Sequence, residues 1–388
     1  MSHKRLKVLI VTMDYPPRYG GLGSVTYALE KGLRAAGVLV RLLNFDGSSI
    51  SNRGYLSTRD LFYTSATRNS HFAPHKILNP LSSLAIDGGF RDFVYNNMIY
   101  RISQQFIKQF KPDIIHITRA KLYCAVFGVQ EPIVANCHAE EVRKAYPIQY
   151  IANNAAKILC YSNYTRNLLV GLYPQSTKRT ELMHPPIDVK KYRTSDKRPR
   201  RNQVVVMSRL EKAKNIDTVV KSIEYVPAQI LSKYRFLIIG EGTEEDRLKK
   251  LTDKLHLDNV VTFCGGLSEN EKIALLKESK LYVLCPKRYD NMAEAFGITF
   301  LEAQAAGLPV IASRIGGIPE AVGNGGIYID DVDNPREIAD KMTRMLTDSQ
   351  LYSRTQDNIL DRINNFDTNR WIAKLLIVYR SLLGRDDI

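Results

Sequence analysis

The sequence lacks the features that mark secreted, membrane-spanning and metal-binding proteins. Its five cysteines show no paired spacing of the kind that holds a metal ion. No uninterrupted apolar run approaches the roughly 18 to 20 residues that a membrane-spanning helix requires. The chain begins basic and then apolar, but Asp14 and a Pro-Pro pair interrupt it where a signal peptide would have its cleavage site. We therefore expect a reduced, cytoplasmic protein without a transmembrane segment.

The sequence also lacks the motifs of dinucleotide-binding and of nucleic-acid-binding proteins. Gly20, Gly21 and Gly23 form a glycine-rich turn after the first apolar run, but they do not have the G-x-G-x-x-G spacing of dinucleotide-binding proteins. Such a turn can bring the backbone close to a phosphate, and it can equally be no more than a flexible connection. The sequence contains no recognised nucleic-acid-binding motif either.

Positive charge is concentrated in one part of the chain. Residues 1–185 hold 23 lysines and arginines against 11 acidic residues, a net charge of +12. Residues 186–201 hold 7 against 2, or +5, and the remainder holds 25 against 27, or −2. A nucleic acid, an anionic membrane or a phosphorylated ligand would each suit the basic part.

The order of short apolar runs and helical patterns predicts two α/β domains, in keeping with a length of 388 residues. In the first half we expect strands at 7–12, 38–45, 113–117, 133–137 and 157–161, a helix near 93–110, and mostly loop over 46–90. Prolines and dense charge then mark an interdomain linker at 186–201.

The second half repeats the same alternation of strand and helix. We expect strands at 204–207, 236–239, 260–263, 281–284, 310–312 and 326–329, and a final helix at 370–383. Short apolar runs are typical of strands buried on both faces of a parallel sheet. Two doubly wound sheets follow, with ligands expected at the carboxyl ends of the strands.

The most informative segment contains two carboxylates, Glu294 and Glu302, on either side of Gly297. A helix is predicted over 299–306, and the N–H groups at its start can hold an anion that Gly297 allows to approach closely. Acids before and after an anion site suit a ligand with hydroxyl groups on both sides of a diphosphate, such as a nucleotide sugar. The alternative is two exposed glutamates on one helical face.

Other polar residues follow predicted strands. Arg209 and Lys214 lie five residues apart after the strand at 204–207, and such a pair can bind a diphosphate from two sides. A solvated basic turn is the alternative interpretation. His138 follows the strand at 133–137, where it would face the ligand edge of the sheet or have only a structural role.

Taken together, these features resemble the retaining glycosyltransferases of family 4 (group 1), which have the GT-B fold. The resemblance covers nearly the whole chain and rests on the following residues: Gly20-Gly21, His138, Ser162 with Arg166, Pro186-Ile-Asp188, Arg209, Lys214, Gly240-Glu-Gly242, Glu294, Glu302, Gly316-Gly317 and Trp371. Two departures are the residues His184-Pro185 before Pro186 and the length of 287–293. They bear on the acceptor and sugar contacts more than on the phosphate site.

The resemblance implies a fold of two Rossmann-like domains facing a central cleft. The domains would be an acceptor-binding domain at 1–185, a basic linker at 186–201 and a nucleotide-sugar-binding domain at 202–366. A C-terminal helix at 367–388 would pack back onto the first domain.

The resemblance also implies transfer of a mannose- or glucose-type sugar from a nucleotide diphosphate sugar, forming an α-glycosidic bond. His138, Arg209, Lys214 and Glu294 would be catalytic. The donor would contact the following residues: Gly20, Gly21, Arg209, Lys214, Glu294, Phe296, Gly297, Ile298, Thr299 and Glu302. We find no Asp-x-Asp metal motif in the sequence and therefore expect no metal cofactor. The length of 287–293 resembles mannosyltransferase-like members and favours GDP-mannose over a UDP-sugar.

The acceptor implied is a glycan, a lipid-linked molecule or a small molecule, with peripheral contact to an anionic inner membrane face. Two other classes compete. A basic nucleic-acid-binding protein would explain the charge of residues 1–185, and competition by a nucleotide diphosphate rather than by salt alone would argue against it. A nicotinamide-dependent oxidoreductase would explain two α/β domains, but this sequence lacks the glycine fingerprint of such enzymes.

Overall fold

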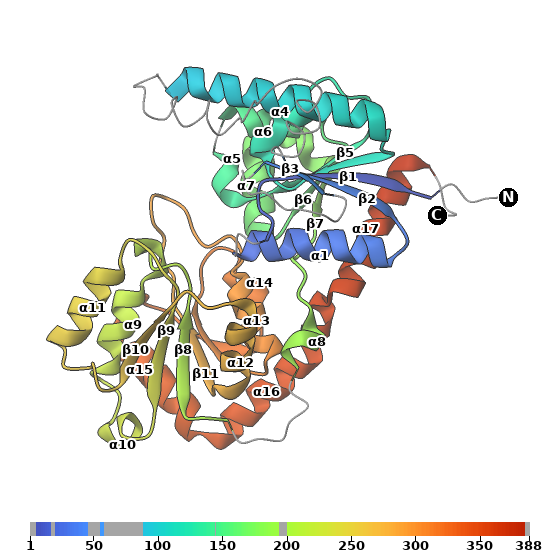
Figure 1. The fold of residues 1–388 in the computed structure, drawn as a ribbon. Helices are drawn as coiled ribbons and strands as arrows, with labels where there is room; N and C mark the ends of the chain where they lie inside the picture. The colour runs from blue at the N-terminus through green and yellow to red at the C-terminus, as the bar shows by residue number, and fades with distance from the viewer. Residues whose placement is uncertain are drawn as a thin grey trace. The chain divides into compact units, whose positions relative to one another are not determined.

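The computed structural model describes residues 5–16, 20–45, 55–57, 88–143, 145–193 and 200–384. The chain divides into two compact units. The first unit contains residues 1–184 together with 369–388, and the second contains 185–368 (Figure 1). The last 20 residues of the chain therefore belong to the unit that contains its beginning.

The first unit is built on a seven-stranded sheet with the order β3-β2-β1-β4-β5-β6-β7, all pairs parallel. Its strands are β1 (Lys7–Thr12), β2 (Leu39–Asn44), β3 (Tyr55–Ser57), β4 (Ile114–Ile117), β5 (Ile133–Cys137), β6 (Lys157–Cys160) and β7 (Thr180–Leu182). Its α-helices are α1 (Gly21–Ala35), α4 (Gly88–Phe110), α5 (Ala139–Val142), α6 (Ala145–Asn154), α7 (Asn163–Leu172) and α17 (Thr368–Leu383), with short 3-10 helices η1 (Ala120–Val126) and η2 (Pro174–Arg179).

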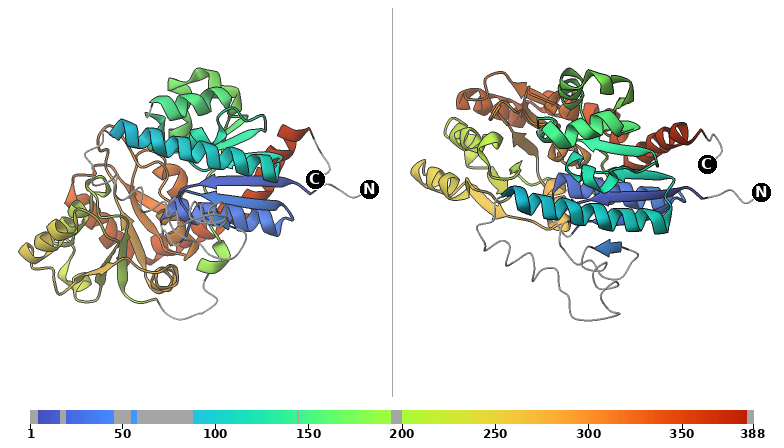
Figure 2. Two further views of the ribbon diagram at one scale, coloured as in Figure 1. Left: turned by 45° about the horizontal axis from the view of Figure 1, so that its top comes forward. Right: turned by 90° about the horizontal axis from the view of Figure 1, so that it is seen from above.

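Both faces of this sheet are covered, because alternate side chains of a strand point to opposite faces. Leu9 and Val11 of β1 pack in one core with residues of α4 and α6. Val8 and Ile10 pack in another with residues of α1 and of the C-terminal helix α17. Figure 2 shows α4 and α1 on opposite sides of the sheet. The C-terminal helix is thus part of the first unit's core.

The second unit has a six-stranded sheet with the order β10-β9-β8-β11-β12-β13, again parallel. Its strands are β8 (Gln203–Met207), β9 (Arg235–Ile239), β10 (Val261–Gly265), β11 (Leu281–Leu284), β12 (Val310–Ser313) and β13 (Gly326–Ile329). Its α-helices are α8 (Val189–Tyr192), α9 (Ile216–Ile223), α10 (Ala228–Leu231), α11 (Glu245–Lys254), α12 (Glu269–Glu278), α13 (Ile298–Ala305), α14 (Ile318–Val322), α15 (Pro335–Thr347) and α16 (Ser349–Ile363), with 3-10 helices η3 (Lys212–Lys214) and η4 (Asn364–Phe366).

The expected fold class is confirmed, and the boundaries of the central strands agree to within two residues. The sequence did not predict β3 and β7, two three-residue strands at the edges of the first sheet. Most of the loop expected over 46–90 lies outside the described residues, as do 194–199 of the expected linker. Another part of that linker is the helix α8, whose Val189 and Tyr192 are buried in the core of the second unit.

Candidate functional site

The glutamate segment of the second unit forms a sharp turn into a helix. Gly297 precedes α13 with a φ of +86°, a conformation that glycine adopts without strain. A Cβ atom at this position would lie 2.5 Å from the Phe300 ring, so the turn has no room for a side chain. The N–H groups of Ile298 and Thr299 start the helix beyond it, with no side chain at position 297 to cap them.

Glu294 is paired with Lys214, although the two residues are 80 positions apart in the chain. The Lys214 ammonium donates to Glu294 Oε2, and both side chains are mostly buried, with exposed fractions of 17% and 18%. Arg209 is placed differently. Its guanidinium donates to Glu211 at 2.6 Å and its side chain is 71% exposed. The fold therefore brings Lys214 to Glu294 and leaves Arg209 accessible to an anion.

Glu302 lies in α13 at the centre of a second charged cluster. Its Oε1 accepts hydrogen bonds from Lys272 Nζ at 2.6 Å and from the Tyr192 hydroxyl at 3.1 Å. Lys272 also pairs with Glu269 at 2.7 Å. Burial raises the pKa of Tyr192, and the charges of Glu302 and Glu269 raise it further, so the hydroxyl keeps its proton and donates. One carboxylate oxygen is thus held in place by two donors.

Two glycine turns that follow β9 and β12 approach the backbone of their neighbours. At Gly240, which has a φ of +128°, a Cβ atom would lie 1.9 Å from the carbonyl oxygen of Ser208, next to Arg209. The Gly316-Gly317 turn contacts Glu294 itself, since Gly317 N–H donates to the Glu294 carbonyl at 2.9 Å. The turns therefore fix the backbone on which the candidate side chains stand.

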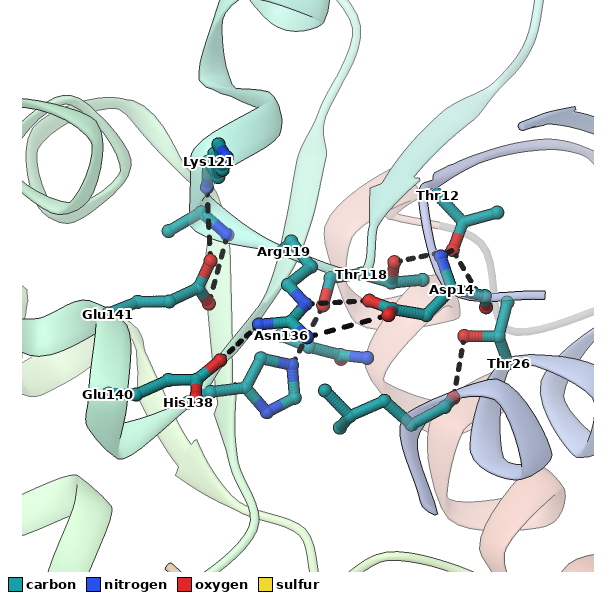
Figure 3. Close-up of polar contacts among 12 residues, drawn as sticks. Thr12, Asp14, Thr26, Thr118, Arg119, Lys121, Asn136, His138, Glu140 and Glu141 are labelled. Atoms are coloured by element: carbon teal, nitrogen blue, oxygen red, sulfur yellow. Dashed lines mark hydrogen bonds and ion pairs between the residues drawn. The ribbon is translucent and has the colours of Figure 1, made fainter. Parts of the chain in front are cut away.

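His138 of the first unit follows β5 and is buried, with 7% of the residue exposed. Its Nε2 lies 2.9 Å from the carbonyl oxygen of Thr118 (Figure 3). A carbonyl can only accept, so Nε2 carries the proton and donates. Nδ1 has no hydrogen-bond partner among the residues that the structure describes, and it is the ring atom left for a ligand.

A charged cluster lies beside His138 at the carboxyl ends of β1, β4 and β5. Arg119 donates to Asp14 at 2.6 Å through Nε and to Glu140 through Nη1 (Figure 3). Burial lowers the pKa of Arg119, but the bond and charge of Asp14 outweigh it and the net shift is upward. Thr118 connects the cluster to β1 through a 2.8 Å bond to the Thr12 hydroxyl.

The predicted glycine turn starts the first helix of this unit. Gly20 is the residue before α1 and Gly21 its first residue, and both are exposed. Residues 17–19 of the same turn lie outside the described part of the chain. The backbone around Gly20 has open space, since a Cβ atom there would meet no neighbour within 4 Å.

One Asp-x-Asp pair does occur, Asp331 and Asp333, after β13. Asp333 pairs with Lys287 at 3.2 Å, and Asp331 accepts from the Asp333 N–H at 3.0 Å. Across the described ranges, no group of three or more histidine, cysteine, aspartate or glutamate side chains is arranged to hold a metal ion.

Comparison with known families connects both units to one kind of enzyme. Residues 189–362 match the family described as "Glycosyl transferases group 1", and residues 19–191 match "Glycosyltransferase Family 4". The chain belongs to the family 4, group 1 glycosyltransferases. Membership of this family favours glycosyl transfer over the two competing interpretations, a nucleic-acid-binding protein and a nicotinamide-dependent oxidoreductase.

Individual relatives of this glycosyltransferase match over most of its length. A GDP-mannose-dependent alpha-(1-6)-phosphatidylinositol monomannoside mannosyltransferase of Mycobacterium tuberculosis is 27% identical, covering 88% of this chain and 89% of the relative. A glycogen synthase of the same species is 24% identical, covering 86% and 84%.

Solved structures of glycosyltransferases share the fold. HepE of Anabaena, solved with UDP and glucose, has a TM-score of 0.70 at 17% identity and covers 96% of this chain and 99% of its own. TarM has a TM-score of 0.77 at 13% identity and covers 97% and 99%. At these identities the likeness establishes the GT-B fold.

Sequence reasoning missed several residues of the two clusters, among them Tyr192, Lys272, Asp14 and Arg119. Tyr192 lies within the predicted linker, and Lys272 lies on a helix with no motif of its own. Asp14 and Arg119 both follow predicted strands, and that position was the signal that could have identified them. Their pairing across 105 residues required the strand order of the sheet.

Proposed function

We propose that this glycosyltransferase transfers a mannose- or glucose-type sugar from a nucleotide diphosphate sugar to a hydroxyl group of its acceptor, with retention of the anomeric configuration and formation of an α-glycosidic bond. The observation that carries the proposal is the Lys214–Glu294 pair beside the start of α13. It places a cation, a carboxylate and free helical N–H groups together, which suits the diphosphate and the sugar of one ligand.

Each side chain would have a separate task. Lys214 and the exposed Arg209 would neutralise the diphosphate as it leaves, helped by the N–H groups of Ile298 and Thr299. Glu294 would bind hydroxyl groups of the transferred sugar. Glu302, held through one oxygen by Lys272 and Tyr192, would bind the ribose hydroxyls with its other oxygen.

The first unit would supply the remaining contacts. His138 would accept a hydrogen bond from the donor sugar through Nδ1, and Gly20 and Gly21 would close over the phosphates. We assign no enzymatic nucleophile. The acceptor hydroxyl would attack on the face from which the diphosphate leaves, and a phosphate oxygen would take its proton. Catalysis would then rest on positioning and electrostatic stabilisation, with no metal ion required.

The domain roles follow from the same assignment. We propose that residues 1–185 bind the acceptor and 202–366 bind the nucleotide sugar. The basic charge of the first part, +12, suits an acceptor that is lipid-linked or held at an anionic inner membrane face. Across the described residues, no helix combines the length and the apolar character that crossing a membrane requires. Membrane contact would be peripheral.

A thermal-shift panel tests the donor assignment. GDP, UDP and ADP are compared with GDP-mannose, UDP-glucose and ADP-glucose, because a ligand that binds only the folded protein raises its melting temperature. We expect one nucleotide series to stabilise the protein, and the length of 287–293 favours the guanosine series. Proton NMR of the sugar product then distinguishes retention from inversion. Absence of stabilisation by every nucleotide would contradict the proposal.

A further inference from the structure

A chain of buried polar side chains connects the C-terminal helix of the first unit to the interior of its sheet. Tyr379 of α17 lies 2.5 Å from His116 Nδ1 of β4, through its hydroxyl. His116 Nε2 lies 3.0 Å from Asn136 Oδ1 of β5. Asn136 Nδ2 donates to the hydroxyl of Tyr161, which follows β6, at 2.8 Å. At most 5% of any of the four residues is exposed.

The direction of these hydrogen bonds is fixed by chemistry. Because the Asn136 amide nitrogen donates to Tyr161, its oxygen accepts from His116, whose Nε2 must carry a proton. Burial lowers the pKa of His116 to about 4, partly offset by the bond to Asn136, so the ring is neutral and Nδ1 is an acceptor. Burial raises the pKa of Tyr379, which keeps its proton and donates.

The chain ends against His138. The rings of Tyr161 and His138 meet edge to face, with centroids 5.3 Å apart and an interplanar angle of 73°. A second contact that orients His138 is its hydrogen bond to the carbonyl of Thr118. A shift of the Tyr161 ring would therefore turn the imidazole about the Thr118 bond and redirect Nδ1.

We propose that Tyr379 is a positioning residue for His138. The C-terminal helix, through the relay Tyr379–His116–Asn136–Tyr161, sets the orientation of the imidazole, so its return to the first unit serves the site as well as the core. Only the expected effect of Tyr379 on catalysis rests on the proposed function. The ring-nitrogen signals of His138, which respond to its contacts, can be measured without any substrate.

The spectroscopic test uses Tyr379→Phe, which retains the buried ring and removes one hydroxyl. Long-range ¹H–¹⁵N spectra resolve the tautomers of the seven histidines, and the variants His116→Gln and His138→Ala assign two of them. We expect Tyr379→Phe to shift the His116 and His138 ring signals together. Tyr161→Phe, which cuts the relay at its other end, should shift both as well. Leu375→Ala changes an equally buried residue of the same helix and should leave His138 unchanged.

The kinetic test measures release of nucleoside diphosphate from GDP-mannose or UDP-glucose. We expect Tyr379→Phe to lower kcat about three- to tenfold with the nucleotide Kd unchanged, and to have no further effect in the His138→Ala background. A His138 signal and a kcat that are both unaffected by Tyr379→Phe would overturn the proposal, as would additive effects in the double variant.

The two proposals fail in different ways. If His138→Ala releases nucleoside diphosphate as fast as the wild type, the catalytic role of His138 is wrong. The spectra still decide the relay in that case, since they report the protonation and hydrogen bonding of each ring nitrogen independently of turnover. If Tyr379→Phe does not fold, Tyr161→Phe and its spectrum give the same decision.

Discussion

The two units hold their candidate side chains by different means. In the second unit each carboxylate is bonded to a lysine, Glu294 to Lys214 and Glu302 to Lys272. In the first unit His138 is held by a backbone carbonyl and an aromatic ring, backed by a relay of neutral groups. A residue of an ion pair can exchange its partner for a charged ligand. A member of a chain of buried neutral hydrogen bonds cannot change its partner without leaving a buried polar group unpaired.

This difference suggests how the candidate residues of each unit would act. In the second unit, Lys214 could exchange its ion pair with Glu294 for one with the arriving diphosphate. The Glu294 carboxylate would then be available to bind the sugar. In the first unit, His138 would keep one orientation throughout the reaction. Variants of the two units test that contrast.

Lys214→Ala should have the largest effect, because it removes a partly buried cation from both the diphosphate and Glu294. We expect turnover to fall by about 10²- to 10³-fold. Arg209→Ala should cost less, about tenfold, because that side chain is exposed and held only by Glu211. Steady-state kinetics with the donor identified by thermal shift measures both. Lys212→Ala, an exposed lysine in the same turn, is the control and should change turnover less than about twofold. Wild-type kinetics in both variants would place the diphosphate site elsewhere.

Glu294→Ala and Glu302→Ala should separate the sugar from the nucleotide. Loss of Glu294 should reduce turnover and affinity for the intact donor by about 10- to 100-fold while sparing the nucleoside diphosphate, because Lys214 is still present to bind it. Loss of Glu302 should weaken the binding of both the nucleoside diphosphate and the intact donor. Calorimetric titration of each variant with nucleotide and with intact donor makes the comparison. Equal losses of both ligands in both variants would refute the assignment of sugar and ribose.

Acid should weaken the first unit through His116. The folded-state pKa is about 4 and the ordinary value is 6.5, so the unfolded chain takes up the proton first as the pH falls. Stability should therefore be lost between pH 6.5 and about 4, by roughly 3 kcal/mol at most, and this contribution should not change further below that range.

Denaturant unfolding followed by the fluorescence of Trp371, at each pH, measures this loss of stability. Trp371 is the only tryptophan and is buried in the core of the first unit. His116→Gln is the control, since it cannot titrate but retains the acid response of every carboxylate. If both proteins show the same dependence on pH between 6.5 and 4, burial does not hold His116 neutral.

Membrane association should show the smallest effect and should depend on the first unit alone. Reversing two exposed charges on α4, with Arg101→Glu and Lys108→Glu, should reduce co-sedimentation with anionic vesicles at low salt by several-fold, since an anionic surface attracts basic side chains. Lys250→Glu and Lys254→Glu on α11 change the net charge equally in the second unit and should have little effect. If anionic and neutral vesicles bind the wild type equally at low salt, a soluble acceptor is the better hypothesis.

The sequence determined the class of fold and most of the candidate residues, because both depend on local patterns. Short apolar runs between helical patterns identified the central strands, since strands buried on both faces have no polar alternation to obscure them. Glu294, Gly297 and Glu302 were recognisable from spacing alone. The edge strands β3 and β7 were not predicted, since three residues give too little periodicity.

Which side chains meet depends on how distant segments of the chain pack together. Lys214 pairs with Glu294 while Arg209 pairs with Glu211, and Lys272 and Tyr192 converge on Glu302 from separate helices. The relay from Tyr379 to His138 joins α17 to strands that begin over 200 residues earlier. No local pattern encodes such contacts, because they follow from strand order and helix packing, which place distant segments at one edge of a sheet.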